Sequence, residues 1–127
     1  MFQHNDCTIE SLTMKIDSII KIETPQVLAE CDPAFTEQNR LKTILGESYY
    51  KRGILLAERR DKGDVGRAIY DLGQVINLFN LFRAESFKPL YLSDAYERRA
   101  QLYEEIGCTS SAERNRIMAE QLQNRGV

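Results

Sequence analysis

The residues best suited to metal binding or nucleophilic catalysis are one histidine and three cysteines, and their spacing favours neither. His4 and Cys7 form an HxxC pair near the amino terminus. A structural zinc site needs four ligands, and no second cluster supplies the other two. Cys31 and Cys108 stand at wide, unrelated positions, and no histidine is available to activate a thiol. We therefore expect no metal site and no cysteine-based catalysis.

The sequence also offers little for acid–base or phosphate chemistry. Glu104 and Glu105 are adjacent, so on a helix their side chains point about 100° apart and make a poor catalytic pair. The glycines are scattered at expected helix ends, and none forms a phosphate-binding loop after a strand. We expect a protein that is not an enzyme and that uses no cofactor.

Arginine pairs are the remaining side chains that could contact a nucleic acid. Arg59-Arg60 and Arg98-Arg99 could bind RNA, with surface tyrosines stacking on its bases. Acidic residues stand beside both pairs, which favours an ion-paired helix surface. The chain has 17 basic and 19 acidic residues and a net charge of −2, so no positive field attracts nucleic acid. RNA binding is thus an alternative function, and nucleic acid is not the expected partner.

Length and composition place these residues in one helical domain. The 127 residues suffice for one hydrophobic core but not for two. Hydrophobic residues make up 43% and charged residues 28%, as in a folded globular protein. Three prolines, seven glycines and no tryptophan give too few turn signals for an all-β fold. We predict a single all-α domain over residues 1–127.

The amino terminus and the cysteine content bear on location. Residues 1–6 show no basic and apolar leader pattern, and nowhere do about 18 uninterrupted apolar residues occur. The odd number of cysteines forms no disulfide framework, which fits reduced thiols. We expect a cytoplasmic protein that is not associated with a membrane.

Apolar spacing and capping signals predict the helices. Apolar residues recur at helical spacing from Ile9 to Ile20, and the Thr24-Pro25 and Asp32-Pro33 pairs mark two further helix starts. The chain is thus expected to form amino-terminal capping helices and two helical hairpins, at residues 8–31, about 34–80 and 90–124, respectively.

The two hairpins match each other position by position. At an offset of 47 residues, Tyr49 falls on Tyr96 and Arg52 on Arg99. After the turn the offset is 44, which indicates an insertion near residues 60–62 of the first copy. A small residue between two bulky ones on the first helix lets a second helix cross closely. We therefore expect each copy to be a helical hairpin with a tight crossing, at Gly53 against Ala68 in the first and at Ala100 against Ala112 in the second.

Both copies resemble a tetratricopeptide repeat. Arginine replaces the usual leucine in each first helix, and Asn80 stands where the family has a helix-ending proline. The resemblance implies antiparallel hairpins stacked as a short right-handed superhelix. It rests on Tyr49-x-x-Arg52-Gly53-x-x-Leu56 with Gly63, Ala68, Leu72 and Val75, and on Tyr96-x-x-Arg99-Ala100-x-x-Tyr103 with Gly107, Ala112, Arg116 and Ala119.

This resemblance implies a protein-binding module such as an adaptor, co-chaperone or assembly factor. First helices of such hairpins line a concave surface that holds a protein segment. Acidic residues offset the basic ones here, so no clamp for a terminal carboxylate is expected, and a mixed or basic ligand fits better. The family's groove positions carry over to Glu47, Tyr50, Lys51, Ile54, Asp94, Glu97, Arg98 and Gln101.

The apolar stripe of the first helix must also be covered, because two repeats are fewer than a stable stack usually needs. The stripe either caps the stack within the monomer or packs on a second copy of the chain and forms a homodimer. A small chaperone that shields a hydrophobic segment of one partner is a concrete form of this function.

Overall fold

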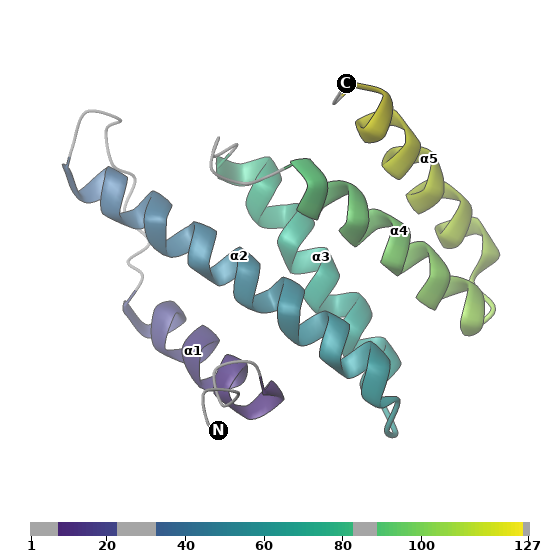
Figure 1. Ribbon diagram of the computed structural model, residues 1–127, viewed down its shortest axis with the longest axis horizontal. Coiled ribbons are helices and arrows are strands. Elements are labelled where there is room, and N and C mark those ends of the chain that lie inside the picture. Colours follow the sequence, from purple (N-terminus) through teal and green to yellow (C-terminus); the bar gives the residue numbers. More distant parts are fainter. Residues whose placement is uncertain (1–7, 23–32, 83–88, 126–127) are drawn as a thin grey trace.

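The computed structural model describes residues 8–22, 33–82 and 89–125, and in these ranges all regular structure is helical (Figure 1). The predicted all-α fold class is confirmed. Residues 23–32, which hold the second predicted amino-terminal helix, lie outside the described residues. The helices are α1 (Ile9–Ile22), α2 (Pro33–Arg59), α3 (Asp64–Phe82), α4 (Pro89–Glu105) and α5 (Thr109–Arg125).

Local sequence signals set the ends of these helices. Before α1, the Thr8 and Ser11 side-chain oxygens accept each other's backbone N–H at 3.1 and 3.0 Å. Prolines open α2 and α4, where a missing N–H costs nothing. After α4, Gly107 has a φ of 85° and the Cys108 N–H donates to the Tyr103 carbonyl, which closes a Schellman turn.

The helices stack in chain order (Figure 1). α1 packs on α2, α2 pairs with α3, α3 packs on α4, and α4 pairs with α5. The first hairpin ends at Phe82, slightly beyond its predicted end. Corresponding positions of the two hairpins are buried alike: Leu45 and Leu92, Gly53 and Ala100, Ala68 and Ala112, and Val75 and Ala119.

α2 and α3 approach each other closely at Gly53. A Cβ at this position would lie 3.3 Å from both Asp71 Cβ and Leu72 Cγ. We expected Gly53 to cross at Ala68, which is completely buried but lies one turn earlier on α3. The crossing brings Asp71 close to α2.

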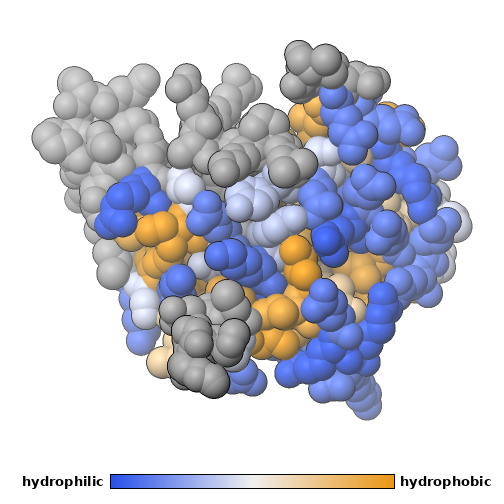
Figure 2. Space-filling model, viewed as in Figure 1, coloured by the Kyte–Doolittle hydropathy of each residue, from blue (hydrophilic) through white to orange (hydrophobic). Residues whose placement is uncertain are grey.

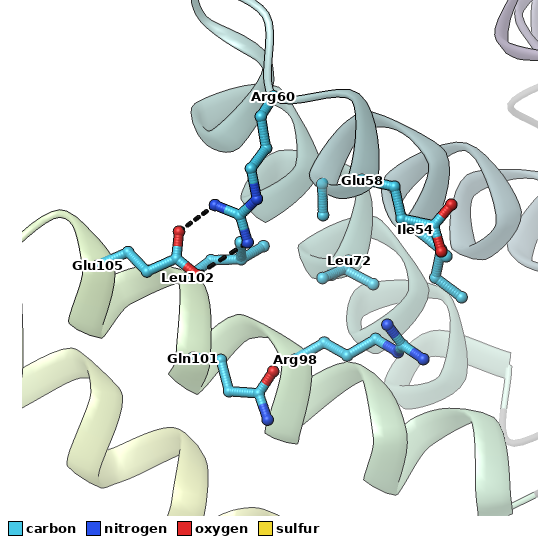
Figure 3. Close-up of a pocket in the computed structure, with 10 residues that line it drawn as sticks. Ile54, Glu58, Arg60, Leu72, Arg98, Gln101, Leu102 and Glu105 are labelled. Atoms are coloured by element: carbon cyan, nitrogen blue, oxygen red, sulfur yellow. Dashed lines mark hydrogen bonds and ion pairs between the residues drawn. The ribbon is translucent and has the colours of Figure 1, made fainter.

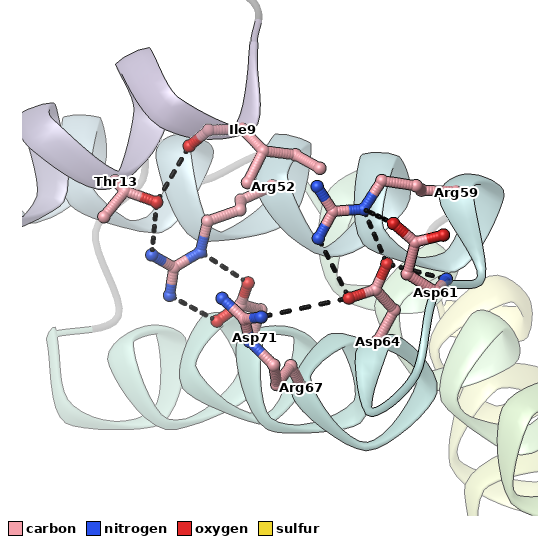
Figure 4. Close-up of polar contacts among 8 residues, drawn as sticks. All are labelled: Ile9, Thr13, Arg52, Arg59, Asp61, Asp64, Arg67 and Asp71. Carbon is pink, nitrogen blue, oxygen red and sulfur yellow. Dashed lines mark hydrogen bonds and ion pairs between the residues drawn. The ribbon is translucent and has the colours of Figure 1, made fainter.

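Arg52 joins three helices at this crossing (Figure 4). Its Nε and Nη2 donate to the two carboxylate oxygens of Asp71, both at 2.8 Å, and its Nη1 donates to Thr13 Oγ1 on α1 at 3.1 Å. The guanidinium also lies 5.6 Å from the ring centroid of Tyr49. The Asp71 side chain is 1% exposed, so its charge is stabilised by this bidentate pair rather than by water.

Arg99 has the corresponding place in the second hairpin. Its Nε donates to Asn115 Oδ1 at 3.1 Å, and Asn115 follows Asp71 by the same offset of 44 residues. Its Nη1 lies 2.9 Å from where a Cβ on Gly73 of α3 would stand. Each arginine therefore joins its own hairpin to the preceding helix.

This correspondence makes α1 a counterpart of α3. Thr13 and Gly73 contact the two arginines, and the same offset of 60 residues aligns the apolar positions of α1 with those of α3. The buried residues of α1 are Leu12, Ile16 and Ile19. These residues of the stripe are thus covered within the chain, whereas Ile20 is 47% exposed. A homodimer through this helix stays a prediction.

None of the helices in the described ranges is long and apolar enough to span a membrane. Those same residues contain no cluster of three or more histidine, cysteine, aspartate and glutamate side chains that could hold a metal ion. His4, Cys7 and Cys31 lie outside them, and Cys108 is an exposed free thiol.

The junction at Arg52 predicts a graded loss of stability. Asp71→Ala should lower the free energy of unfolding by about 3 kcal/mol, because it leaves a largely buried guanidinium without its carboxylate. Asp71→Asn should cost less, about 1 kcal/mol, since an amide oxygen can still accept from Arg52 as Asn115 does from Arg99. Urea unfolding followed by circular dichroism measures both losses.

Asp61→Ala is the matched control. Asp61 lies 3.3 Å from Arg59 but is 68% exposed, so its loss should cost less than about 1 kcal/mol. Equal losses for Asp71→Ala and Asp61→Ala would contradict the role of the junction.

Candidate functional site

A groove lies between α2 and α4, the first helices of the two hairpins. Its volume is about 210 Å³. On the face in Figure 2, hydrophobic side chains gather over the C-terminal half of α2 beside α4, with hydrophilic residues around them. The lining residues of this α2–α4 groove are Gly53, Ile54, Ala57, Glu58, Arg60, Leu72, Arg98, Gln101, Leu102 and Glu105.

The groove combines an apolar floor with an ion pair at one end (Figure 3). Leu72 of α3 and Leu102 of α4 are buried, while Ile54 is half-buried on the α2 side. At the end of the two helices, the Arg60 guanidinium pairs with both carboxylate oxygens of Glu105. The hydrogen bonds from Arg60 hold the pKa of Glu105 below its usual value. The pair joins the C-terminal ends of α2 and α4 across this end of the groove.

Arg60 takes this place at a conformational cost. Its φ is 58°, in the left-handed region, and it lies 47 residues before Gly107, which has a φ of 85°. Glycine adopts this backbone freely, whereas another residue pays about 1 kcal/mol. Glycine at this position would avoid the conformational cost but could not form the ion pair with Glu105.

A tyrosine cluster lies one turn beyond the other end of the groove. Tyr50 donates its hydroxyl proton to Asp94 Oδ2 at 2.5 Å, and Arg98 Nε donates to the same oxygen at 2.6 Å. The Tyr50 and Tyr91 rings lie 4.8 Å apart between centroids. Burial, followed by the hydrogen bond to Asp94, raises the pKa of Tyr50 to about 12. The hydroxyl therefore remains a donor throughout the neutral range.

The residues predicted to bind a partner fall into three groups. Ile54, Arg98 and Gln101 line the groove. Tyr50 and Asp94 belong to the cluster at its end, together with Arg98. The remaining three lie on the same helices but do not line the groove: Glu47, Lys51 and Glu97.

The charges of the groove leave one carboxylate without a cation. Both lining arginines have acidic partners, Arg60 with Glu105 and Arg98 with Asp94. Glu58 is exposed, and none of the described residues forms an ion pair with it. A ligand that brings a positive charge to Glu58 is therefore favoured over an acidic one.

The prediction from the sequence missed the floor and the closed end of the groove. Leu72 lies on α3, whereas the family's groove positions are all on first helices. Ala57 and Glu58 follow Ile54 by three and four residues, so extending the same helix face would have found them. Glu58 and Glu105 also match at the repeat offset of 47.

Comparison of the chain with protein-family models, curated proteins and solved structures gives no match. The resemblance to tetratricopeptide repeats therefore stays a prediction, which rests on the motif and on the corresponding positions of the two hairpins.

The Tyr50 cluster predicts a loss of stability at high pH. Below pH 10 the tyrosine is protonated in both the folded and the unfolded chain. Between pH 10 and about 12 it ionises only in the unfolded chain, so the free energy of unfolding should fall over this range. Chemical denaturation across this range measures the fall, and NMR of the Tyr50 ring carbons measures its pKa.

Tyr50→Phe and Asp94→Asn are the controls for this effect. Tyr50→Phe should remove the part of the pH dependence that belongs to this residue. Asp94→Asn should lower the pKa of Tyr50 only part of the way, since burial, the largest cause, remains. A Tyr50 pKa near 10 in the unaltered protein would contradict the arrangement.

Proposed function

We propose that this protein is a non-enzymatic interaction module, an adaptor, co-chaperone or assembly factor, that binds a segment of another protein in the α2–α4 groove. The observation that carries the proposal is an apolar floor framed by two first helices and closed at one end by the Arg60–Glu105 pair. A preformed groove of this kind suits a side chain presented by an extended or helical segment.

The groove also defines the kind of segment. Ile54 and Ala57, both half-buried, give one apolar side chain a surface above the buried Leu72 and Leu102, and Glu58 offers a partner for a lysine or arginine nearby. The Tyr50–Asp94–Arg98 cluster is internally hydrogen-bonded, so it shapes the groove more than it attracts charge. The proposed ligand is a segment with an apolar residue beside a basic one.

RNA binding receives less support from the arginines named for it. Three of the four have acidic partners: Arg59 pairs with Asp64, Arg60 with Glu105 and Arg98 with Asp94. The fourth, Arg99, donates to the neutral amide oxygen of Asn115. Charges already paired within the protein attract phosphates weakly.

Photo-crosslinking from the groove tests the proposal. A benzophenone amino acid at Gln101, which is exposed and lines the groove, should capture a partner in lysate, whereas the same probe at Glu113 on α5 should not. Mass spectrometry of the crosslink identifies the captured segment, which can then be synthesised as a labelled peptide.

Charge reversal at Glu58 tests the proposed ligand chemistry. Glu58→Lys should weaken binding of that peptide at least about tenfold, or about 1.4 kcal/mol, in a fluorescence anisotropy titration. Glu113→Lys is the matched control, and both variants should melt like the unaltered protein because both sites are exposed. Equal capture from both positions, or unchanged affinity of Glu58→Lys, would remove the groove as the binding site.

A further inference from the structure

A second pocket lies between α4 and α5. Its volume is about 180 Å³, and it shares no lining residue with the α2–α4 groove. Its lining contains two arginines and no carboxylate. The residues of this α4–α5 pocket are Tyr96, Arg99, Tyr103, Ser111, Arg114, Asn115 and Met118.

The arginines at the matching positions of the two hairpins have different partners. Arg52 is neutralised by both carboxylate oxygens of Asp71. Arg99, at the matching position, donates one hydrogen bond, to the neutral amide oxygen of Asn115. Its remaining guanidinium N–H groups have no hydrogen-bond acceptor among the described residues. The second hairpin thus keeps a positive charge where the first cancels one.

Arg114 adds a second positive charge at the same pocket. It is exposed, and its contact within the described ranges is a long 3.4 Å bond to Ser111 Oγ. Neither Arg99 nor Arg114 has a carboxylate partner within the described part of the chain. Other described arginines do have one, namely Arg52, Arg59, Arg60, Arg67, Arg98 and Arg116.

The rest of the pocket suits a side chain with an apolar stem. Tyr96, Tyr103 and Met118 are half-buried and supply apolar walls. Arg99 is held 5.6 Å from the Tyr103 ring centroid and is hydrogen-bonded to Asn115, which is 5% exposed. The guanidinium is therefore oriented before any ligand arrives, which reduces the entropic cost of binding.

We propose that the α4–α5 pocket binds the carboxylate of a glutamate side chain from an acidic protein segment. Arginine and carboxylate match in charge and in planar geometry, and the methylenes of glutamate would contact the tyrosine and methionine walls. Two arginines in one open pocket suit one anionic group, whereas a nucleic acid is held by a row of phosphate contacts. This site is independent of the α2–α4 groove, which favours a basic segment.

The test uses a matched pair of peptides and the substitution found in the first hairpin. Acetyl-tetraglutamate-amide is titrated into the protein while the arginine Nε–H signals are followed by NMR, with acetyl-tetraglutamine-amide as the neutral control. Asn115→Asp would give Arg99 the carboxylate that Arg52 already has, and should weaken binding at least tenfold. It also removes the hydrogen bond that Asn115 Nδ2 donates to the Ser111 carbonyl at 2.6 Å, so thermal melting of this variant is measured alongside. Arg114→Gln should also weaken binding, and Arg116→Gln, outside the pocket, should not.

The site is established if the Arg99 and Arg114 signals of the unaltered protein shift with the glutamate peptide. They should not shift with the glutamine peptide, nor with the glutamate peptide in Asn115→Asp. If Asn115→Asp fails to fold, the comparison of Arg114→Gln with Arg116→Gln decides. Equal binding by Asn115→Asp when it folds, or by the glutamine peptide, would overturn the proposal. Binding of sodium phosphate without any binding of the peptide would also overturn it, because that result indicates a small-anion site. Tighter binding of an oligouridylate than of the peptide would overturn it too, because that result indicates an RNA site.

Discussion

The arrangement of the helices depends on an arginine that each first helix buries between its neighbours. Arg52 lies where α1, α2 and α3 meet and donates hydrogen bonds to two of them. A leucine, which tetratricopeptide repeats usually have at the corresponding position, would pack there without directional preference. A guanidinium instead requires acceptors at defined angles, so it fixes how α1 and α3 are rotated about α2. The close approach at Gly53 brings the Asp71 carboxylate within reach of Arg52.

The α2–α4 groove follows from this fixed geometry and from the turn after α2. With α3 held against α2, Leu72 reaches the space between α2 and α4 and forms the floor. α2 ends at Arg59, and the next residue, Arg60, has the left-handed backbone conformation that Gly107 has in the second hairpin. The cost of about 1 kcal/mol for that conformation is offset in part by the pair with Glu105. A groove framed by such pairs is formed before a ligand binds, so less binding energy is lost to ordering it.

The sequence was sufficient to predict the helices and insufficient to predict which polar groups meet. Helix ends are encoded locally, by the Thr8–Ser11 cap, the prolines and Gly107, so they can be read without knowing the packing. The match of Arg52 with Arg99 was visible too. Their partners Asp71 and Asn115 lie on second helices, however, and only the packing of the helices determines which residues there come within reach of the arginines. The same holds for the groove, since its first-helix positions followed from the repeat, while Leu72 and the Arg60–Glu105 pair required the turn geometry.

The position-by-position match also explains how two hairpins and one additional helix form a stack. α3 carries Ile69, Leu72 and Ile76, and α1 carries Ile9, Leu12 and Ile16 at the corresponding positions, all of them buried or half-buried. On α5 the same positions hold Glu113, Arg116 and Glu120, all exposed. A further helix could not dock there through the same apolar contact, because docking would bury these charged side chains. The apolar contact is therefore not offered again by α5, and the two proposed binding sites, the α2–α4 groove and the α4–α5 pocket, lie on the sides of the hairpins.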